Sequence, residues 1–140
     1  PAGQTRDYIF GYTILNDVSA RDVQTAHKQW YFGKSLDGFT PIGPCIVTAD
    51  AFADYPPRLG ICSFVNGEKR QDSNTALQIF DIDHVIAELS QGMTLKAGTI
   101  IATGTPAGVG MGMDPPQFLK PGDVVRCEIK GIGTLTNPVK

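Results

Sequence analysis

Apolar residues along this chain fall into short runs separated by glycine and proline, and such runs are typical of strands joined by turns. The runs that we expect to form strands are 8–15, 44–48, 59–65, 68–71 and 124–129, with a closing hairpin arm over 131–136. The dipeptide Asn66-Gly67 separates two of these runs. Because both central residues of a type I′ turn need positive φ, this dipeptide predicts a hairpin at that point.

The first of two helical segments follows Asn16-Asp17. Ser19 and Asp22 stand at the spacing of a capping box, which predicts a helix from about residue 20 to 30 that ends before Gly33. One face of this helix is expected to carry four polar side chains, because residues three and four apart are neighbours on a helix. They are Arg21, Gln24, Thr25 and Lys28.

The second helix is predicted over 82–91, where apolar residues recur at helical spacing behind a possible cap, Asp81 or Asp83. Gly92 is its expected end. Segments 95–101 and 119–125 each look like a tight turn that leads into a strand, and 103–116 is a loop rich in glycine and proline. Together these elements predict an α+β fold that is mostly β, a rolled mixed β-sandwich or barrel with short flanking helices.

The composition narrows the class of protein. The 140 residues correspond to one domain, and the net charge of −2 comes without a cluster of Lys and Arg, so a nucleic-acid partner is not expected. The apolar stretches are far shorter than the roughly 20 residues of a membrane span. We therefore expect a cytoplasmic protein without a membrane partner. The 3 cysteines, Cys45, Cys62 and Cys127, lack CxxC spacing and predict reduced, buried thiols.

Three polar residues near the first helix are candidates for chemistry. Asp17 follows an apolar strand, where a carboxylate could meet a ligand or metal at the sheet edge, although an Asn-Asp pair also turns a chain well. Arg21 and Gln24 lie in the first turns of the helix, where an Arg fork and an amide donor would suit a substrate carboxylate. The alternative for both is a solvated helix face.

Two further candidates lie in loops. Lys34 follows Gly33, but a P-loop is excluded because the first glycine of that motif would fall on Lys28. Lys34 is then either a cation that reaches a site or an ordinary surface lysine. Thr105 lies in a glycine loop that fails the GxGxxG pattern, so dinucleotide binding is not expected. Its hydroxyl could contact an oxyanion or carboxylate.

The histidines and glutamates of the chain do not form the motifs of common catalytic or metal sites. His27 and His84 are the only histidines, and neither stands in a recognisable nucleophile motif with Ser or Cys. The glutamates Glu68, Glu88 and Glu128 are isolated from one another in the sequence. Hard cations need several oxygen ligands, so these residues do not predict a complete metal site.

Five blocks of sequence resemble, in their order and spacing, the fumarylacetoacetate hydrolase family. The blocks are GYTILNDVSARDVQ (11–24), GKSLDGFTPIGP (33–44), VNGE (65–68), TGTPAGVG (103–110) and LKPGD (119–123). The resemblance runs from about residue 8 to the end of the chain. By this resemblance, residues 1–140 are identified as the C-terminal portion of one catalytic domain of the family.

The resemblance also implies roles for the candidate residues. Family members bind Mg²⁺, or Mn²⁺ or Ca²⁺, with a Glu-x-Glu pair and one aspartate, which corresponds to Asp17. Arg21 and Gln24 match residues that neighbour the metal and the substrate, and Arg21 could add catalytic positive charge. Lys34 matches a catalytic cation near the developing enolate. Thr105 matches a residue that contacts the carboxylate end of the substrate.

One departure from the family pattern, the lack of a Glu-x-Glu pair, is expected to affect metal binding. The Glu-x-Glu pair, and the His or Glu residues that act as catalytic base in many members, belong upstream of Gly11, and Glu-x-Glu occurs nowhere in this chain. The chain also begins with Pro1 and not with Met. We therefore expect that the upstream part of the domain is missing, or that this is a shortened relative. Either way, the chain alone should hold metal weakly or not at all.

The resemblance implies an enzyme, usually a homodimer, that acts on small 2-oxo acids through a metal-stabilised enolate. The block 36–44 resembles members acting on dicarboxylic 2-oxo acids, and from it we expect hydrolysis of a C–C bond in an acylpyruvate such as fumarylpyruvate. One alternative is isomerisation or decarboxylation of 2-oxo dicarboxylic acids on the same scaffold. Others are a non-catalytic remnant of the fold and a Ser or Cys hydrolase.

Overall fold

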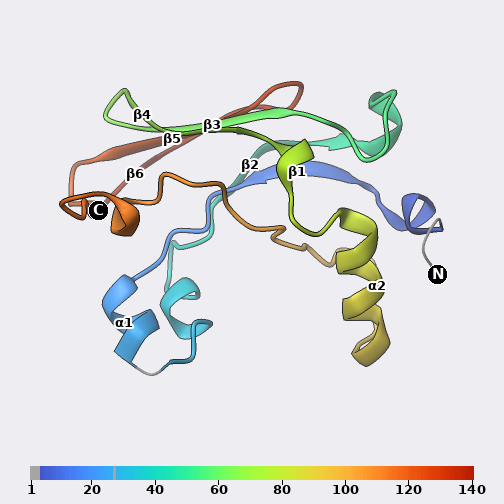
Figure 1. Cartoon of the computed structure of the whole chain (residues 1–140), viewed down its shortest axis with the longest axis horizontal. Coiled ribbons are helices and arrows are strands. Elements are labelled where there is room, and N and C mark those ends of the chain that lie inside the picture. Colours follow the sequence, from blue (N-terminus) through green and yellow to red (C-terminus); the bar gives the residue numbers. More distant parts are fainter. Residues whose placement is uncertain (1–3, 27) are drawn as a thin grey trace.

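The computed structural model describes residues 4–26 and 28–140 (Figure 1). The strands are β1 (Gly11–Leu15), β2 (Ile42–Thr48), β3 (Gly60–Val65), β4 (Glu68–Asn74), β5 (Val124–Ile129) and β6 (Gly133–Pro138). The α-helices within these residues are α1 (Arg21–Ala26) and α2 (Ile82–Gly92). Pro1 and His27, which the sequence analysis singled out, lie outside the described residues.

The strands form two antiparallel sheets. Strand β1 pairs with β2, and the larger sheet has the order β4-β3-β5-β6. Asn66 and Gly67 join β3 to β4 with φ of 52° and 84°, which confirms the predicted hairpin turn. The α+β fold, mostly β, is likewise confirmed, and every pairing in the described chain is antiparallel.

The core lies where the two sheets pack on each other. Ile14 of β1 is 2% exposed and contacts Ile132 and Leu135 from the β5–β6 hairpin. Gly133 permits the close approach of the sheets, because a Cβ built there would lie 3.1 Å from the ring of Pro44 in β2. The apolar residues of β1, β2 and the last hairpin therefore form one packed centre.

The cysteines are all free, but the prediction that all are buried is wrong for Cys45. This residue lies in β2, whose residues are largely exposed, including Ile46 at 54%. Cys62 and Cys127 lie in β3 and β5 and are partly buried. The reason for the error is that β2 pairs with β1 alone, so part of its surface is not covered by the described chain.

Helix α1 is shorter than predicted and starts differently. It ends at Ala26, and Lys28 has a φ of 53°, which a right-handed helix cannot contain. Lys28 therefore does not share a helical face with Arg21. The hydroxyl of Ser19 donates to the carbonyl of Asp17, 3.2 Å away, which does not correspond to the predicted capping box. Gly33 lies against the first turn of α1 and does not end the helix.

Helix α2 matches its prediction closely. The Asp81 carboxylate accepts a 2.7 Å hydrogen bond from the His84 amide and so caps the first turn. The predicted strand at the end of 95–101 is not formed, since the chain there pairs with neither of the described sheets. Among the residues described, no helix combines the length and apolar content needed to cross a bilayer.

A polar cluster attaches α2 to the N-terminal 3-10 helix η1 (Thr5–Tyr8). The hydroxyls of Thr5 and Tyr55 both donate to the Asp83 carboxylate. Burial, together with the hydrogen bond to Asp83, raises the pKa of Tyr55 to about 12. Helix α1, helix α2 and the segment around residues 103–117 all project to the same side of the sheets (Figure 1). The candidate residues come mainly from this side.

Candidate active site

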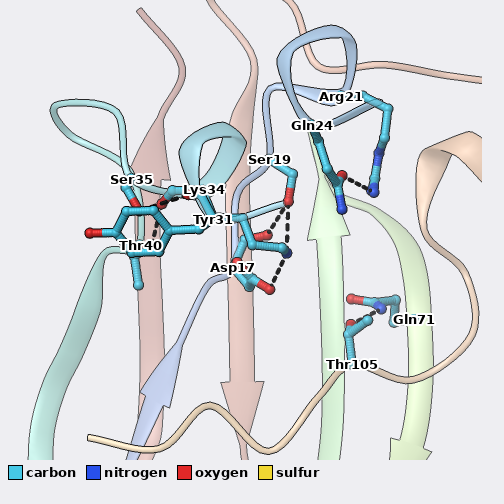
Figure 2. Close-up of polar contacts among 10 residues, drawn as sticks. All are labelled: Asp17, Ser19, Arg21, Gln24, Tyr31, Lys34, Ser35, Thr40, Gln71 and Thr105. Atoms are coloured by element: carbon cyan, nitrogen blue, oxygen red, sulfur yellow. Dashed lines mark hydrogen bonds and ion pairs between the residues drawn. The ribbon is translucent and has the colours of Figure 1, made fainter. Parts of the chain in front are cut away.

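An aspartate and a lysine meet at the end of β1. The Lys34 ammonium forms an ion pair with the carboxylate of Asp17 and donates a 3.1 Å hydrogen bond to the hydroxyl of Ser19 (Figure 2). The side chains of Asp17 and Lys34 are 37% and 29% exposed, so solvent and small ligands can reach both. The structure thus places a carboxylate and a cation in contact at an accessible strand end.

Backbone contacts fix the lysine opposite the aspartate. Lys34 belongs to the 3-10 helix η2 (Phe32–Lys34), and its carbonyl accepts a 3.0 Å bond from the Thr40 hydroxyl. Gly33 packs so tightly on α1 that a Cβ there would lie 2.8 Å from the Cβ of Gln24. The Ala20 amide also donates to the Gly33 carbonyl at 2.8 Å. A glycine is therefore required beside Lys34 by close packing.

Arg21 and Gln24 form a second pair on α1. One guanidinium nitrogen of Arg21 donates to the amide oxygen of Gln24 at 2.6 Å. Gln24 is 4% exposed, so its amide is part of the packing between α1 and η2. A guanidinium has five N–H donors, and this contact uses one nitrogen. Arg21 can therefore hold Gln24 and still present donors to an anion.

Thr105 is held by a side chain from the larger sheet. The amide nitrogen of Gln71 in β4 donates to the Thr105 hydroxyl at 2.8 Å and to the Pro106 carbonyl at 2.9 Å. The Ser63 hydroxyl in β3 donates to the amide oxygen of Gln71 at 2.8 Å. Thr105 itself is exposed. A chain of hydrogen bonds thus runs from the sheet to an accessible hydroxyl.

The profile of the fumarylacetoacetate hydrolase family, described as "Fumarylacetoacetate (FAA) hydrolase C-terminal", matches residues 1–140. The chain belongs to this family. Its relatives in the fumarylacetoacetate hydrolase family include the oxaloacetate tautomerase YisK of Bacillus subtilis, 51% identical over 133 residues, which are 95% of this chain and 44% of that protein. An uncharacterized protein of Staphylococcus saprophyticus is 51% identical over 98% of this chain and 45% of its own length.

Solved structures of family members have the same fold. A fumarylacetoacetate hydrolase from Exiguobacterium antarcticum superposes with a TM-score of 0.95 at 52% identity, covering 100% of this chain and 50% of that one. A 2-hydroxyhepta-2,4-diene-1,7-dioate isomerase from Mycobacterium marinum gives a TM-score of 0.85 at 47% identity, covering 98% and 50%. The chain therefore spans about half the length of the family members that it matches.

In the structure, the five predicted site residues take part in three side-chain contacts. Asp17 meets Lys34, Arg21 meets Gln24, and Thr105 meets Gln71, a residue that sequence reasoning missed (Figure 2). Ser19, the other partner of Lys34, was assigned only to a helix cap. The signal that could have found Gln71 is the polar Ser63 inside an apolar strand, because a buried hydroxyl needs a partner.

A divalent metal, which the family implies, fits Asp17 as one ligand. Its accessible carboxylate is the kind of hard oxygen donor that Mg²⁺, Mn²⁺ and Ca²⁺ prefer. Over residues 4–26 and 28–140, however, no group of three or more His, Cys, Asp or Glu side chains is placed to hold an ion. Since these cations take about six or more ligands, the remaining ones must come from water, substrate or residues outside this set.

Proposed function

We propose that the protein containing this chain interconverts tautomers or isomers of a small dicarboxylic 2-oxo acid such as oxaloacetate. The observation that carries the proposal is the contact of the Lys34 ammonium with the Asp17 carboxylate at an accessible strand end. Two relatives support it by their names, an oxaloacetate tautomerase and a 2-hydroxyhepta-2,4-diene-1,7-dioate isomerase. They favour isomerisation over the hydrolysis that the sequence first led us to expect.

The reaction needs stabilisation of negative charge on the 2-oxo oxygen. In keto–enol conversion, the enol O–H loses its proton and a proton is added to the neighbouring carbon, so an enolate is formed in between. The Lys34 ammonium, held beside Asp17 and Ser19, would provide positive charge close to where the enolate forms. Arg21 and Thr105 would bind the carboxylates and orient the acid with their donors.

A divalent cation would supply Lewis-acid polarisation of the carbonyl, with Asp17 as one of its ligands. We further propose that a Glu-x-Glu pair and a catalytic base, both outside this chain, complete the site. Within the chain, the Lys34 ammonium is the cation paired with the Asp17 carboxylate. This places the proposed charge-stabilising group and the proposed ligand in direct contact.

The decisive experiment uses the full-length protein with Mg²⁺ and enol oxaloacetate. Loss of the ultraviolet absorbance of the enol should be accelerated, stopped by a chelator and restored by added Mg²⁺. Activity that persists in chelator but is lost on alkylation of cysteine would favour a Cys hydrolase and refute the proposal. Complete inactivity on 2-oxo acids would favour a non-catalytic remnant of the fold.

Hydrolysis of an acylpyruvate is the second candidate. It is favoured by the 52% identity to the fumarylacetoacetate hydrolase of Exiguobacterium antarcticum. Tautomerisation passes through the enolate of the intact acid, and hydrolysis adds water to the acyl carbonyl and releases the enolate of pyruvate. Both reactions need stabilisation of a 2-oxo acid enolate, so one scaffold can host both. Separate assays of fumarylpyruvate cleavage and oxaloacetate decarboxylation, under the same conditions, would rank the three reactions by kcat/KM.

A further inference from the structure

The side chain of Gln71 has a fixed amide orientation. The Pro106 carbonyl can only accept a hydrogen bond, so the NH₂ group of Gln71 must face it. The amide oxygen then faces the Ser63 hydroxyl, which is 8% exposed and donates to it at 2.8 Å. A flipped amide would bring its oxygen against the carbonyl oxygen of Pro106. Neighbouring groups on both sides therefore set the orientation.

This orientation determines what the Thr105 hydroxyl can do. Its oxygen accepts a hydrogen bond from Gln71 Nε2 at 2.8 Å, so its own hydrogen must point away from the amide. A hydroxyl has one hydrogen to donate. Since Thr105 is exposed, that hydrogen is available to a ligand. The partner that suits it best accepts hydrogen bonds without donating any, and a carboxylate is such a group.

We propose that Gln71 is a positioning residue that makes Thr105 a hydrogen-bond donor to a substrate carboxylate. Ser63 supports it by holding the amide oxygen. This inference rests on the proposed function, because it takes the ligand of Thr105 to be the carboxylate of a 2-oxo acid. Gln71 acts through Thr105 and does not touch the substrate itself.

The loop that carries Thr105 has other attachments to the sheet. A Cβ on Gly108 would lie 2.0 Å from the Arg70 carbonyl oxygen, so the loop backbone lies directly on β4 at that point. The Arg70 guanidinium also donates to Gln117 and, at 2.9 Å, to the sulfur of Met113. Because the contacts of Arg70 with this loop do not use the Gln71 amide, the loop should stay in place when the amide is removed. A change at Gln71 can then be separated from loss of the loop.

A double-mutant cycle in the full-length protein tests the inference. Gln71→Met keeps the length of the side chain and removes the amide, and Thr105→Val removes the hydroxyl. Each single variant should raise KM for oxaloacetate and Kd for oxalate by about 10- to 100-fold, with kcat within about 3-fold. The double variant should be within about 3-fold of Thr105→Val, because we attribute the effect of Gln71 on the ligand to that hydroxyl and not to its second contact, with the Pro106 carbonyl.

Gln71→Glu provides a second arm with an opposite electrostatic expectation. Its carboxylate can still accept from Ser63, but it would take the Thr105 hydrogen and repel a bound anion. It should therefore weaken oxalate binding more than Gln71→Met does. Gln91→Met serves as the control, because Gln91 is exposed on α2 and should leave KM and Kd unchanged.

Additive effects in the cycle, or weaker binding by Gln71→Met than by Gln71→Glu, would overturn the inference while leaving the proposed function intact. Thermal unfolding of each variant checks that the fold is kept. If the unsubstituted protein binds oxalate but turns over no 2-oxo acid, the proposed function fails and the oxalate titrations alone decide the inference. If it binds no oxalate either, both are overturned.

Discussion

The Lys34 ammonium is bonded to the Asp17 carboxylate across a separation of 17 residues in the chain. The two residues come from different elements, since Asp17 follows β1 and Lys34 ends the 3-10 helix η2. A lysine in this position competes with any metal cation for the same carboxylate. Replacing Lys34 and replacing Asp17 should therefore have different effects on metal affinity and turnover.

Replacing the aspartate tests its role as a ligand. In the full-length protein, Asp17→Asn should lower Mg²⁺-dependent turnover of oxaloacetate by at least about 100-fold, because the amide is a poorer ligand for a hard cation. Calorimetric titration should show weaker Mg²⁺ binding. Asp22→Asn is a matched control, since Asp22 is an exposed residue in the first turn of α1. Unchanged Mg²⁺ affinity in Asp17→Asn would contradict the assignment.

Replacing the lysine should separate binding of the metal from catalysis. Lys34→Met removes the competing cation, so Mg²⁺ affinity should be equal or higher, while kcat should fall by about 100- to 1000-fold. Lys130→Met, at an exposed residue, should change neither quantity. A variant that loses metal affinity and turnover in parallel would show that Lys34 mainly supports the structure of the site.

Much of the strand framework could be predicted from the sequence, and the reason is local. The Asn66-Gly67 turn depends on positive φ at two neighbouring residues, and the 124–129 strand on apolar residues that recur within a short run. The length of α1 could not be predicted, because the left-handed backbone at Lys28 ends the helical path without a glycine or proline to signal it. The apolar run that ends at Ile101 resembles a strand in sequence, but it pairs with neither sheet.

The site was predictable only in part for a similar reason. The family resemblance pointed to Asp17 and Lys34 individually, and their ion pair appears only when β1 and η2 are placed in space. Gln71 contacts Thr105 across 34 residues of chain, so spacing along the sequence cannot indicate it. Residues that act through another side chain are therefore the ones most easily missed.

The contact between the glycine loop and β4 can be tested with two glycines of similar backbone geometry. Gly108 and Gly98 have φ of 105° and 86°, so alanine strains either position by about 1 kcal/mol. A Cβ at Gly98 meets nothing within 4 Å, whereas one at Gly108 would clash with the Arg70 carbonyl. Gly108→Ala should therefore raise KM for oxaloacetate by more than about 10-fold as Thr105 shifts, and Gly98→Ala should leave KM unchanged. Equal KM values in steady-state assays would contradict this account.

Removing the phenolic hydroxyl of Tyr55 should weaken the attachment of α2 and change how the stability of the protein depends on pH. Tyr55→Phe leaves the Asp83 carboxylate with Thr5 as its hydroxyl donor, at a cost of about 1–2 kcal/mol in the free energy of unfolding. Urea unfolding measures this cost. Tyr8→Phe, at a residue 82% exposed, should stay within about 0.5 kcal/mol of the unsubstituted protein.

The pH dependence follows from the pKa of Tyr55, which the fold raises from 10.0 to about 12. Between these values the unfolded chain loses the phenol proton while the folded chain keeps it, so unfolding becomes more favourable as pH rises. The contribution of Tyr55 to stability is complete below pH 10 and disappears as pH rises through about 12. The stability difference between the unsubstituted protein and Tyr55→Phe should therefore shrink across this window. A constant difference would contradict the raised pKa.

The chain leaves β1 and enters β2 at adjacent points. Leu15 pairs with Ile42, and the Asn16 amide donates to the Pro41 carbonyl at 3.0 Å, so segment 16–41 is closed at its base. This segment carries Asp17, Arg21, Gln24 and Lys34, whereas Thr105 comes from elsewhere. The whole segment could therefore be replaced by the matching segment of a relative without disturbing the register of the two strands. Exchanging it between family members of differing specificity would reveal whether this segment or the rest of the protein determines the substrate.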